Sequence, residues 1–200
     1  MPAILPSKPL SDKFKNLDTR GFIKLANGVD VAEIRQELDA NPDLWNKYGF
    51  RKEAPGTPHT QMTDIWVRSN KLENVGPHFC DEHYPVWYEA GRRLPATKKF
   101  IMDLMAWVGG ENLGGVLITR IPPGLGIDKH VDDSWHAQFF DKFYLQIQGH
   151  PDQAFVSKDH DYRPATGDVY WFNNTREHWV QNNSNIDRIT LIVCIKIDHD

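Results

Sequence analysis

The chain has 200 residues and a formal net charge of −4, with 23 Lys and Arg against 27 Asp and Glu. A chain of this length can bury one sizeable core, and no basic stretch offers the clustered cations that nucleic-acid phosphates require. Its two cysteines, Cys80 and Cys194, lie far apart, which predicts neither a disulfide framework nor a thiolate zinc site. We expect a single domain, residues 1–200, in a reducing cytoplasm and without a nucleic-acid partner.

The sequence also predicts neither secretion nor a membrane span. The first residues contain no apolar stretch of the length that a signal peptide needs. The longest apolar run, residues 189–195, is far shorter than the roughly 20 residues that cross a bilayer.

The first 114 residues predict helices and a few strands. Residues 20–25 are typical of a short strand, and Asp30 and Glu33 have capping-box spacing before a helix that Pro42 ends. The predicted apolar face of this helix contains Val31, Ile34 and Leu38. A strand is predicted at residues 64–68.

Two further helices are predicted before the region of short strands begins. The first begins at Pro85 and runs through Arg93, and the second follows Pro95. Its apolar positions recur at helical spacing at Phe100, Ile101, Leu104, Met105 and Val108. We expect these helices to pack against one face of a β unit.

From residue 115 onward, short strands separated by turns predict a sandwich or barrel. The strands are expected at residues 116–121, 129–133, 142–148, 153–157, 168–173, 178–182 and 188–197. In the third of these, Phe143, Leu145 and Ile147 alternate with Tyr144, Gln146 and Gln148.

Nine histidines make metal binding worth testing, and two of them stand in His-x-Asp sequences. His150-Pro-Asp152 follows a glycine and is most simply a turn. In His130-Val-Asp132 the two side chains of a strand project from one face and can converge on one ion. His178, on another predicted strand, completes two imidazoles and a carboxylate, a set that favours non-haem Fe(II). Asp133 is an alternative ligand, but it projects from the opposite strand face.

The other six histidines are interpreted as surface or hydrogen-bonded residues. They are His59, His78, His83, His136, His160 and His199.

Arg188 comes ten residues after His178, at the start of a strong strand. If Arg188 points inward, so do Thr190, Ile192 and Cys194, while the opposite face is entirely aliphatic. An inward guanidinium needs an anion, which a dicarboxylate cosubstrate can supply while its other end chelates the metal. The alternative is an ion pair with Asp187 or another acid.

Residues 177–193, EHWVQNNSNIDRITLIV, resemble the C-terminal signature of the aspartyl/asparaginyl β-hydroxylase-like branch of the Fe(II)/2-oxoglutarate dioxygenases. The matching features are His178, Asn182 and Asn183, Arg188 and the aliphatic strand, and residues 167–172 resemble the turn and strand before them. The resemblance spans residues 115–197. Animal members of this branch lack the carboxylate of the metal triad, whereas Asp132 is present here.

The resemblance implies a fold that is mainly β with flanking helices, a double-stranded β-helix of the cupin-like jelly-roll type. It implies that His130, Asp132 and His178 bind Fe(II) and that Arg188 binds the distal carboxylate of 2-oxoglutarate, with O₂ as the second cosubstrate. Residues 115–200 would form the catalytic jelly roll, and residues 1–114 would support it. Tyr144 and Thr119 would hydrogen-bond the cosubstrate or serve as ordinary half-buried strand residues.

Two other features bear on the pocket. Trp135, Trp171 and Trp179 lie near the predicted ligands in sequence and either wall the pocket or pack in the core. Residues 59–68 suit a strand at the mouth of a substrate cleft, although Asp64 and Arg68 are equally compatible with the surface.

We therefore expect a hydroxylase acting on an Asp, Asn or other side chain of a protein or peptide. The alternatives are a small-molecule hydroxylase, a prolyl hydroxylase, which usually has Lys where Arg188 stands, or a non-enzymatic cupin-like metal-binding module.

Overall fold

The structure, a computed structural model, describes residue 5 and residues 21–75, 83–157 and 160–198. Its helices are α1 (Ala32–Ala40), α2 (Glu89–Arg93), α3 (Pro95–Trp107) and α4 (Trp135–Phe139). Its strands are β1 (Phe22–Ala26), β2 (Thr63–Asn70), β3 (Pro85–Trp87), β4 (Asn112–Ile121), β5 (Gly126–His130), β6 (Asp141–Gln148), β7 (Gln153–Ser157), β8 (His160–Tyr162), β9 (Val169–Phe172), β10 (His178–Asn182) and β11 (Arg188–Lys196). None of the described helices is long and apolar enough to span a membrane.

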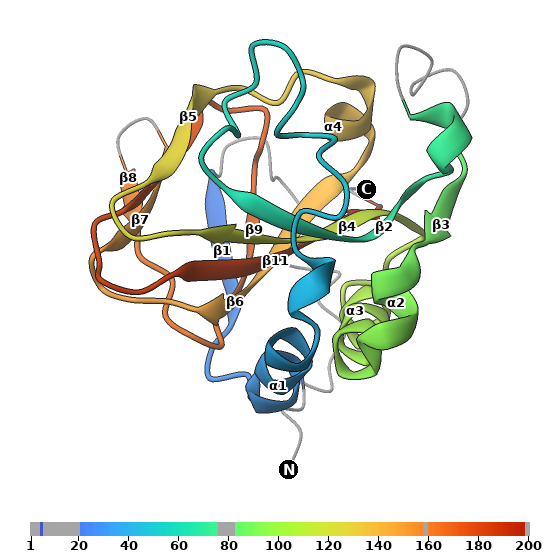
Figure 1. Cartoon of the computed structure of the whole chain (residues 1–200), viewed down its shortest axis with the longest axis horizontal. Coiled ribbons are helices and arrows are strands. Elements are labelled where there is room, and N and C mark those ends of the chain that lie inside the picture. The colour runs from blue at the N-terminus through green and yellow to red at the C-terminus, as the bar shows by residue number, and fades with distance from the viewer. Residues whose placement is uncertain (1–4, 6–20, 76–82, 158–159, 199–200) are drawn as a thin grey trace.

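The strands form two antiparallel sheets (Figure 1). The large sheet has the order β1-β9-β6-β11-β4-β2-β3, and the small sheet has the order β5-β10-β7-β8. An aromatic and aliphatic cluster joins them, with Tyr144 and Tyr170 from the large sheet and Phe155 and Val180 from the small one. The fold is therefore mainly β, a jelly roll with flanking helices, as the sequence predicted.

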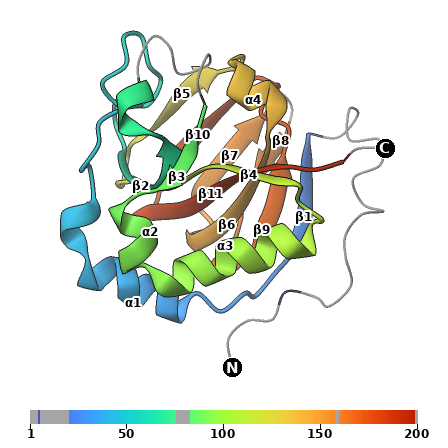
Figure 2. The ribbon, with the colours of Figure 1, turned by 90° about the vertical axis from the view of Figure 1, so that its right-hand side faces the viewer.

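The other face of the large sheet carries the main core. Figure 2 shows α1, α2 and α3 together on one side of the strands. The buried side chains of α1 and α3, among them Ile34, Leu38, Ile101 and Leu104, pack in one cluster with the outward-facing aliphatic residues of the sheet. Three strands from the first 114 residues, β1, β2 and β3, also belong to this sheet.

Strand β11 lies near the centre of the large sheet and separates the core from the space between the sheets. Its neighbours are β6 and β4, with Thr190 opposite Thr119 on one side and Gln146 on the other. Ile189, Leu191, Val193 and Ile195 belong to the helix-covered core, whereas Arg188, Thr190 and Ile192 line a cavity. The alternation predicted for this strand is confirmed.

Three local predictions are wrong in detail. Pro85 begins an edge strand rather than a helix, because residues 85–87 pair with the end of β2 and α2 starts only at Glu89. The capping box does not form, because α1 begins after Val31 and Asp30 Oδ1 accepts the N–H of Ala32 at 2.9 Å rather than that of Glu33. Strand β5 ends at His130 instead of residue 133, and the chain turns there toward α4, which Ser134 caps.

We predict that Leu191→Ala lowers the free energy of unfolding by about 2 to 5 kcal/mol, because it leaves a cavity at a fully buried position between helices and sheet. Urea unfolding measures the loss. Met102→Ala on the exposed face of α3 is the control and should change stability by less than about 0.5 kcal/mol. Equal effects of the two substitutions would contradict the assignment of β11 to the core.

Candidate metal and cosubstrate site

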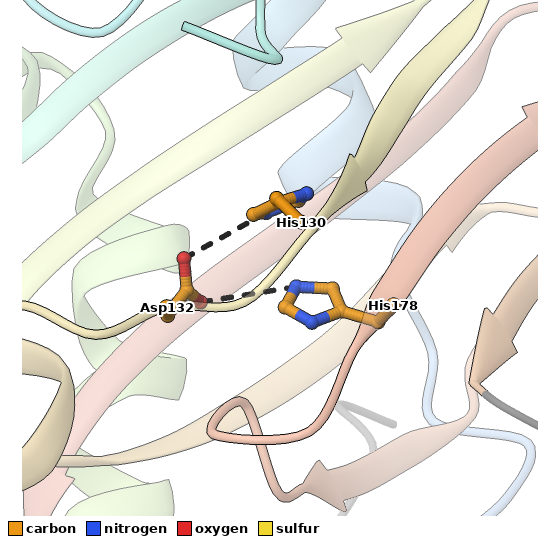
Figure 3. Close-up of side chains that lie close together, drawn as sticks. All are labelled: His130, Asp132 and His178. Carbon is orange, nitrogen blue, oxygen red and sulfur yellow. Dashed lines mark ion pairs between the residues drawn. The ribbon is translucent and has the colours of Figure 1, made fainter.

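Two neighbouring strands of the small sheet bring the predicted metal ligands together. His178 on β10 lies directly opposite His130 on β5, and their ring centroids are 4.2 Å apart. Asp132 follows β5 by two residues and faces both rings, with its Oδ1 3.7 Å from His130 Nε2 and its Oδ2 3.8 Å from His178 Nε2 (Figure 3). One potential ligand atom from each residue lies within 4.8 Å of the others, so the three can share one ion.

Asp132 reaches this position by a different route from the one predicted. Because β5 ends at His130, Asp132 does not share a strand face with it. Instead, the Asp132 N–H donates to the carbonyl of Asn174 at 3.2 Å, which holds the turn beside β10. Asp133 is exposed, so the structure leaves Asp132 as the carboxylate of the cluster.

Backbone carbonyls orient both imidazoles. His130 Nδ1 lies 2.7 Å from the carbonyl of Asp128, and His178 Nδ1 lies 2.8 Å from the carbonyl of Arg176. A carbonyl only accepts hydrogen bonds, so each Nδ1 carries the proton and each Nε2 presents a lone pair toward the ion position. Burial lowers the pKa of His178 to about 4, which keeps its ring neutral and able to bind a metal near pH 7.

Asp132 is ionised although it is largely buried. Burial opposes its charge, but Lys142, whose ammonium forms an ion pair with Oδ2, outweighs this and lowers the pKa of Asp132 to about 2. The cluster therefore offers two imidazole nitrogens and one carboxylate. This donor set fits a divalent transition metal and leaves coordination positions open on one side.

Arg188 lies in the same cavity as the cluster. Arg188 is only 3% exposed, and its Nη2 lies 3.2 Å from the hydroxyl of Tyr170. Its Nε has no hydrogen-bond partner among the residues that the structure describes. Asp187, the alternative partner, lies 4.0 Å from Arg120 Nε, and no acid of the described chain lies within ion-pair distance of Arg188. A buried guanidinium with an unused donor fits an anionic ligand.

A cavity of about 40 Å³ lies between the sheets. All six predicted site residues line it: Thr119, His130, Asp132, Tyr144, His178 and Arg188. Burial raises the pKa of Tyr144 well above its usual value, so its phenol stays neutral. Thr119 Oγ1 donates to Asp64 Oδ1 at 2.9 Å and accepts from Arg51 at 2.8 Å, so its single proton is already used.

Three lining residues were not expected from the sequence. Arg51 and His59 come from the loop before β2, and Lys142 comes from β6. His59 is buried, contrary to its interpretation as an ordinary histidine, because this loop folds against the cavity and brings its ring within 5.1 Å of the His130 ring. The position of Lys142 could have been predicted from the sequence, because Lys142, Tyr144 and Gln146 alternate along β6 and therefore share its inner face.

Other candidates lie away from the cluster. His150 is in the turn between β6 and β7, where its Nδ1 accepts the N–H of Asp152 at 3.2 Å. Trp171 packs in the main core, Trp135 is exposed, and Trp179 lies beside Lys129 outside the cavity. Cys194 is buried and free. Cys80, His78 and His199 lie outside the described residues.

Asp64 and Arg68, which belong to the predicted cleft strand at residues 59–68, both have defined contacts. Asp64 is buried and forms an ion pair with Arg51, so it is not an ordinary surface residue. The guanidinium of Arg68 stacks over the Trp87 ring at 5.3 Å and donates to the carbonyl of Leu113. Of residues 59–68, only His59 lines the cavity.

Comparison with known proteins gives a family match and similar folds. The model of the aspartyl/asparaginyl β-hydroxylase family matches residues 29–197. A 2-oxoglutarate-Fe(II) oxygenase family oxidoreductase from Burkholderia pseudomallei is similar, with a TM-score of 0.60 and 13% identity over 96% of this chain and 91% of that one. No curated protein matches the sequence.

Two prolyl hydroxylases share the fold. The enzyme from Trichoplax adhaerens, solved with a hypoxia inducible factor peptide, gives a TM-score of 0.57 and 13% identity over 94% of this chain and 89% of that one. A prolyl-4-hydroxylase from Pseudomonas putida gives 0.51 and 16% over 94% and 99%.

We predict that His130→Ala and His178→Ala each abolish Fe(II) binding, because two of the three ligands cannot hold the ion in competition with water. Anaerobic equilibrium dialysis with metal analysis measures bound iron. His150→Ala, which changes the other His-x-Asp sequence, is the matched control and should bind iron as the wild type does. If His150→Ala alone lost iron binding, the metal site would lie in the turn that contains His150.

Proposed function

Since this chain belongs to the aspartyl/asparaginyl β-hydroxylase family and is thus a 2-oxoglutarate-dependent hydroxylase, we propose that His130, Asp132 and His178 bind Fe(II) while Arg188 binds 2-oxoglutarate. The observation that carries the proposal is the position of Arg188, a buried cation with an unused donor in the cavity that contains the ligand cluster. A metal-binding module without catalysis has no need of such a group.

Each group of the chain then has a defined task. The two imidazoles and the carboxylate bind one side of the ion, and the Arg188 guanidinium, which the Tyr170 hydroxyl positions by accepting a hydrogen bond, holds the distal carboxylate of the cosubstrate. Bound iron and 2-oxoglutarate supply the activation of O₂, with 2-oxoglutarate converted to succinate and CO₂ as a C–H bond becomes C–OH. Ile127, Phe155 and Val180 give the cavity apolar walls that limit water near the reacting bond.

The substrate we propose is an Asp, Asn or other side chain of a protein or peptide, and the support is the family match. We also propose that residues 1–200 act as one domain, in which residues 1–114 support the jelly roll, and that the enzyme works in the cytoplasm.

We predict that Arg188→Lys weakens 2-oxoglutarate binding by about 10- to 100-fold, because an ammonium keeps the charge but loses the planar pair of donors. Anaerobic titration follows the metal-to-ligand charge-transfer absorption that a keto acid chelated to Fe(II) produces. Iron affinity should change little. Arg35→Lys, at an exposed arginine, is the control.

The wild type should show this absorption band, which makes the same titration the direct test of the proposed function. An unchanged affinity for 2-oxoglutarate in Arg188→Ala would show that another group binds the distal carboxylate.

We predict that the wild type converts 2-oxoglutarate to succinate slowly without its substrate, and that Asp132→Ala does not. The loss is expected because Asp132 is the only carboxylate of the ligand cluster. Succinate is measured with iron, ascorbate and O₂ present, and the exposed neighbour gives the control, Asp133→Ala, which should retain the activity. Full succinate formation by Asp132→Ala would mean that two histidines suffice to hold the iron.

A further inference from the structure

The cavity is closed at the end that contains Arg188 and accessible beside the ligand cluster. Arg188, Thr190 and Tyr144 are at most 4% exposed. Beside the cluster, the side chains of Asp132 and Lys142 are 20% and 18% exposed. A substrate therefore enters next to Asp132, where the described residues leave polar side chains accessible from outside.

Exposed apolar side chains are concentrated next to this opening. Eight large hydrophobic residues of the described chain are at least 36% exposed. Three of them lie within residues 131–139, the segment that begins beside Asp132: Val131, Trp135 and Phe139. Figure 1 shows the chain running from the end of β5 through this segment into α4. The segment that supplies the carboxylate ligand thus also supplies the apolar surface at the opening.

Trp135 and Phe139 form what we call the aromatic platform. They lie four residues apart on α4 and so share one face of the helix. Their rings are stacked, with centroids 5.3 Å apart and planes inclined by 14°, while the two residues remain 42% and 39% exposed. The stacked pair therefore leaves apolar ring surface available to a ligand.

Hydrogen bonds from one residue hold the platform beside the ion position. Asn174 donates from Nδ2 to the carbonyl of Ala137 on α4 at 3.2 Å, and its own carbonyl accepts the N–H of Asp132 at 3.2 Å. The side chain of Asn174 is buried, so both bonds are shielded from water. The metal ligand and the platform are thereby fixed relative to each other.

Buried Phe140 supports the platform on the side of the core. Its ring lies 4.8 Å from that of Phe139 and 6.4 Å from that of Trp135, at 81° and 86° to them. Gly114 on β4 makes room for Phe140, because a Cβ at this position would lie 2.9 Å from its ring. The platform is thus a packed surface rather than two loosely held side chains.

The length of chain between ligand and platform sets the distance that a substrate has to span. Asp132 and Trp135 are three residues apart, so their Cα atoms lie at most roughly 11 Å from each other. In an extended peptide, a residue and its second neighbour lie about 7 Å apart and project to the same side. A peptide whose target side chain enters the cavity therefore places the second neighbour of the target over the platform.

We propose that the aromatic platform binds an apolar side chain of an extended peptide substrate, two residues from the residue that is hydroxylated. The inference rests on the proposed function and adds a requirement on the sequence around the target. It also favours a peptide over a small molecule, because a molecule that fits inside the cavity does not reach Trp135.

The test compares two heptapeptides with acetylated and amidated ends, GLGDGLG and GSGDGSG. They have leucine or serine two positions to either side of a central aspartate, so the comparison holds for both chain directions. Calorimetry measures their binding to anaerobic protein loaded with Fe(II) and 2-oxoglutarate. The wild type should bind the leucine peptide about tenfold more tightly, the ratio expected when roughly 55 Å² of apolar surface leaves water.

Two variants remove the platform one ring at a time. Trp135→Ala should lose the preference for leucine, and Phe139→Ala should lose part of it. Met102→Ala is the matched control, because Met102 is 48% exposed on α3, which covers the other face of the large sheet. It should keep the preference of the wild type.

The charge-transfer band of each protein separates the possible failures. A wild type that shows the band but binds both peptides equally, or binds neither, overturns the inference and leaves the proposed function intact. So do Trp135→Ala and Phe139→Ala proteins that show the band and prefer leucine as the wild type does. A wild type without the band contradicts the proposed function and the inference together.

Sedimentation tests whether a second copy of the chain occupies the platform instead. A wild type that is monomeric with and without the leucine peptide agrees with the inference. A wild-type dimer that Trp135→Ala converts to a monomer would assign the platform to an interface between copies and overturn the inference.

Discussion

The side-chain alternation of β11 is the constraint on which both the core and the site depend. Successive residues of a strand point to opposite faces, so one strand can supply a hydrophobic layer and a polar cavity wall at once. Leu191 and Val193 pack beneath the helices, while Arg188 and Thr190 face the space between the sheets. A shift of one residue in the register with β4 or β6 would bury Arg188 in the aliphatic core, where the described residues offer it no counter-ion.

Charge compensation is the second organising feature of the cavity. The Arg51 guanidinium is neutralised by Asp64, which also accepts from Thr119, so this wall is a closed polar network. Within the described part of the chain, the Arg188 side chain has a hydrogen bond only to the Tyr170 hydroxyl, whereas Lys142 forms an ion pair with Asp132, the carboxylate of the ligand cluster. The cavity thus combines two cations that carboxylates compensate, Arg51 and Lys142, with one, Arg188, that has no acid within ion-pair distance among the described residues.

Most of the β region could be predicted from the sequence because its strands alternate cleanly and its turns contain glycine, proline and aspartate. The end of β5 could not, since it depends on the bond from Asp132 to Asn174, more than forty residues away in sequence. The positions of Arg51 and His59 were also beyond prediction. Their loop has no periodicity, and its place over the cavity depends on tertiary contacts such as the ion pair with Asp64.

The orientation of the two histidines has a consequence for how this site tolerates change. Each ring is fixed by the carbonyl of the residue two positions earlier in its own chain segment, Asp128 for His130 and Arg176 for His178. Substituting the side chain of Asp128 or Arg176 leaves that carbonyl in place. The tautomer of each ligand is therefore maintained by the main chain, and the surrounding sequence is free to vary without changing which nitrogen faces the ion.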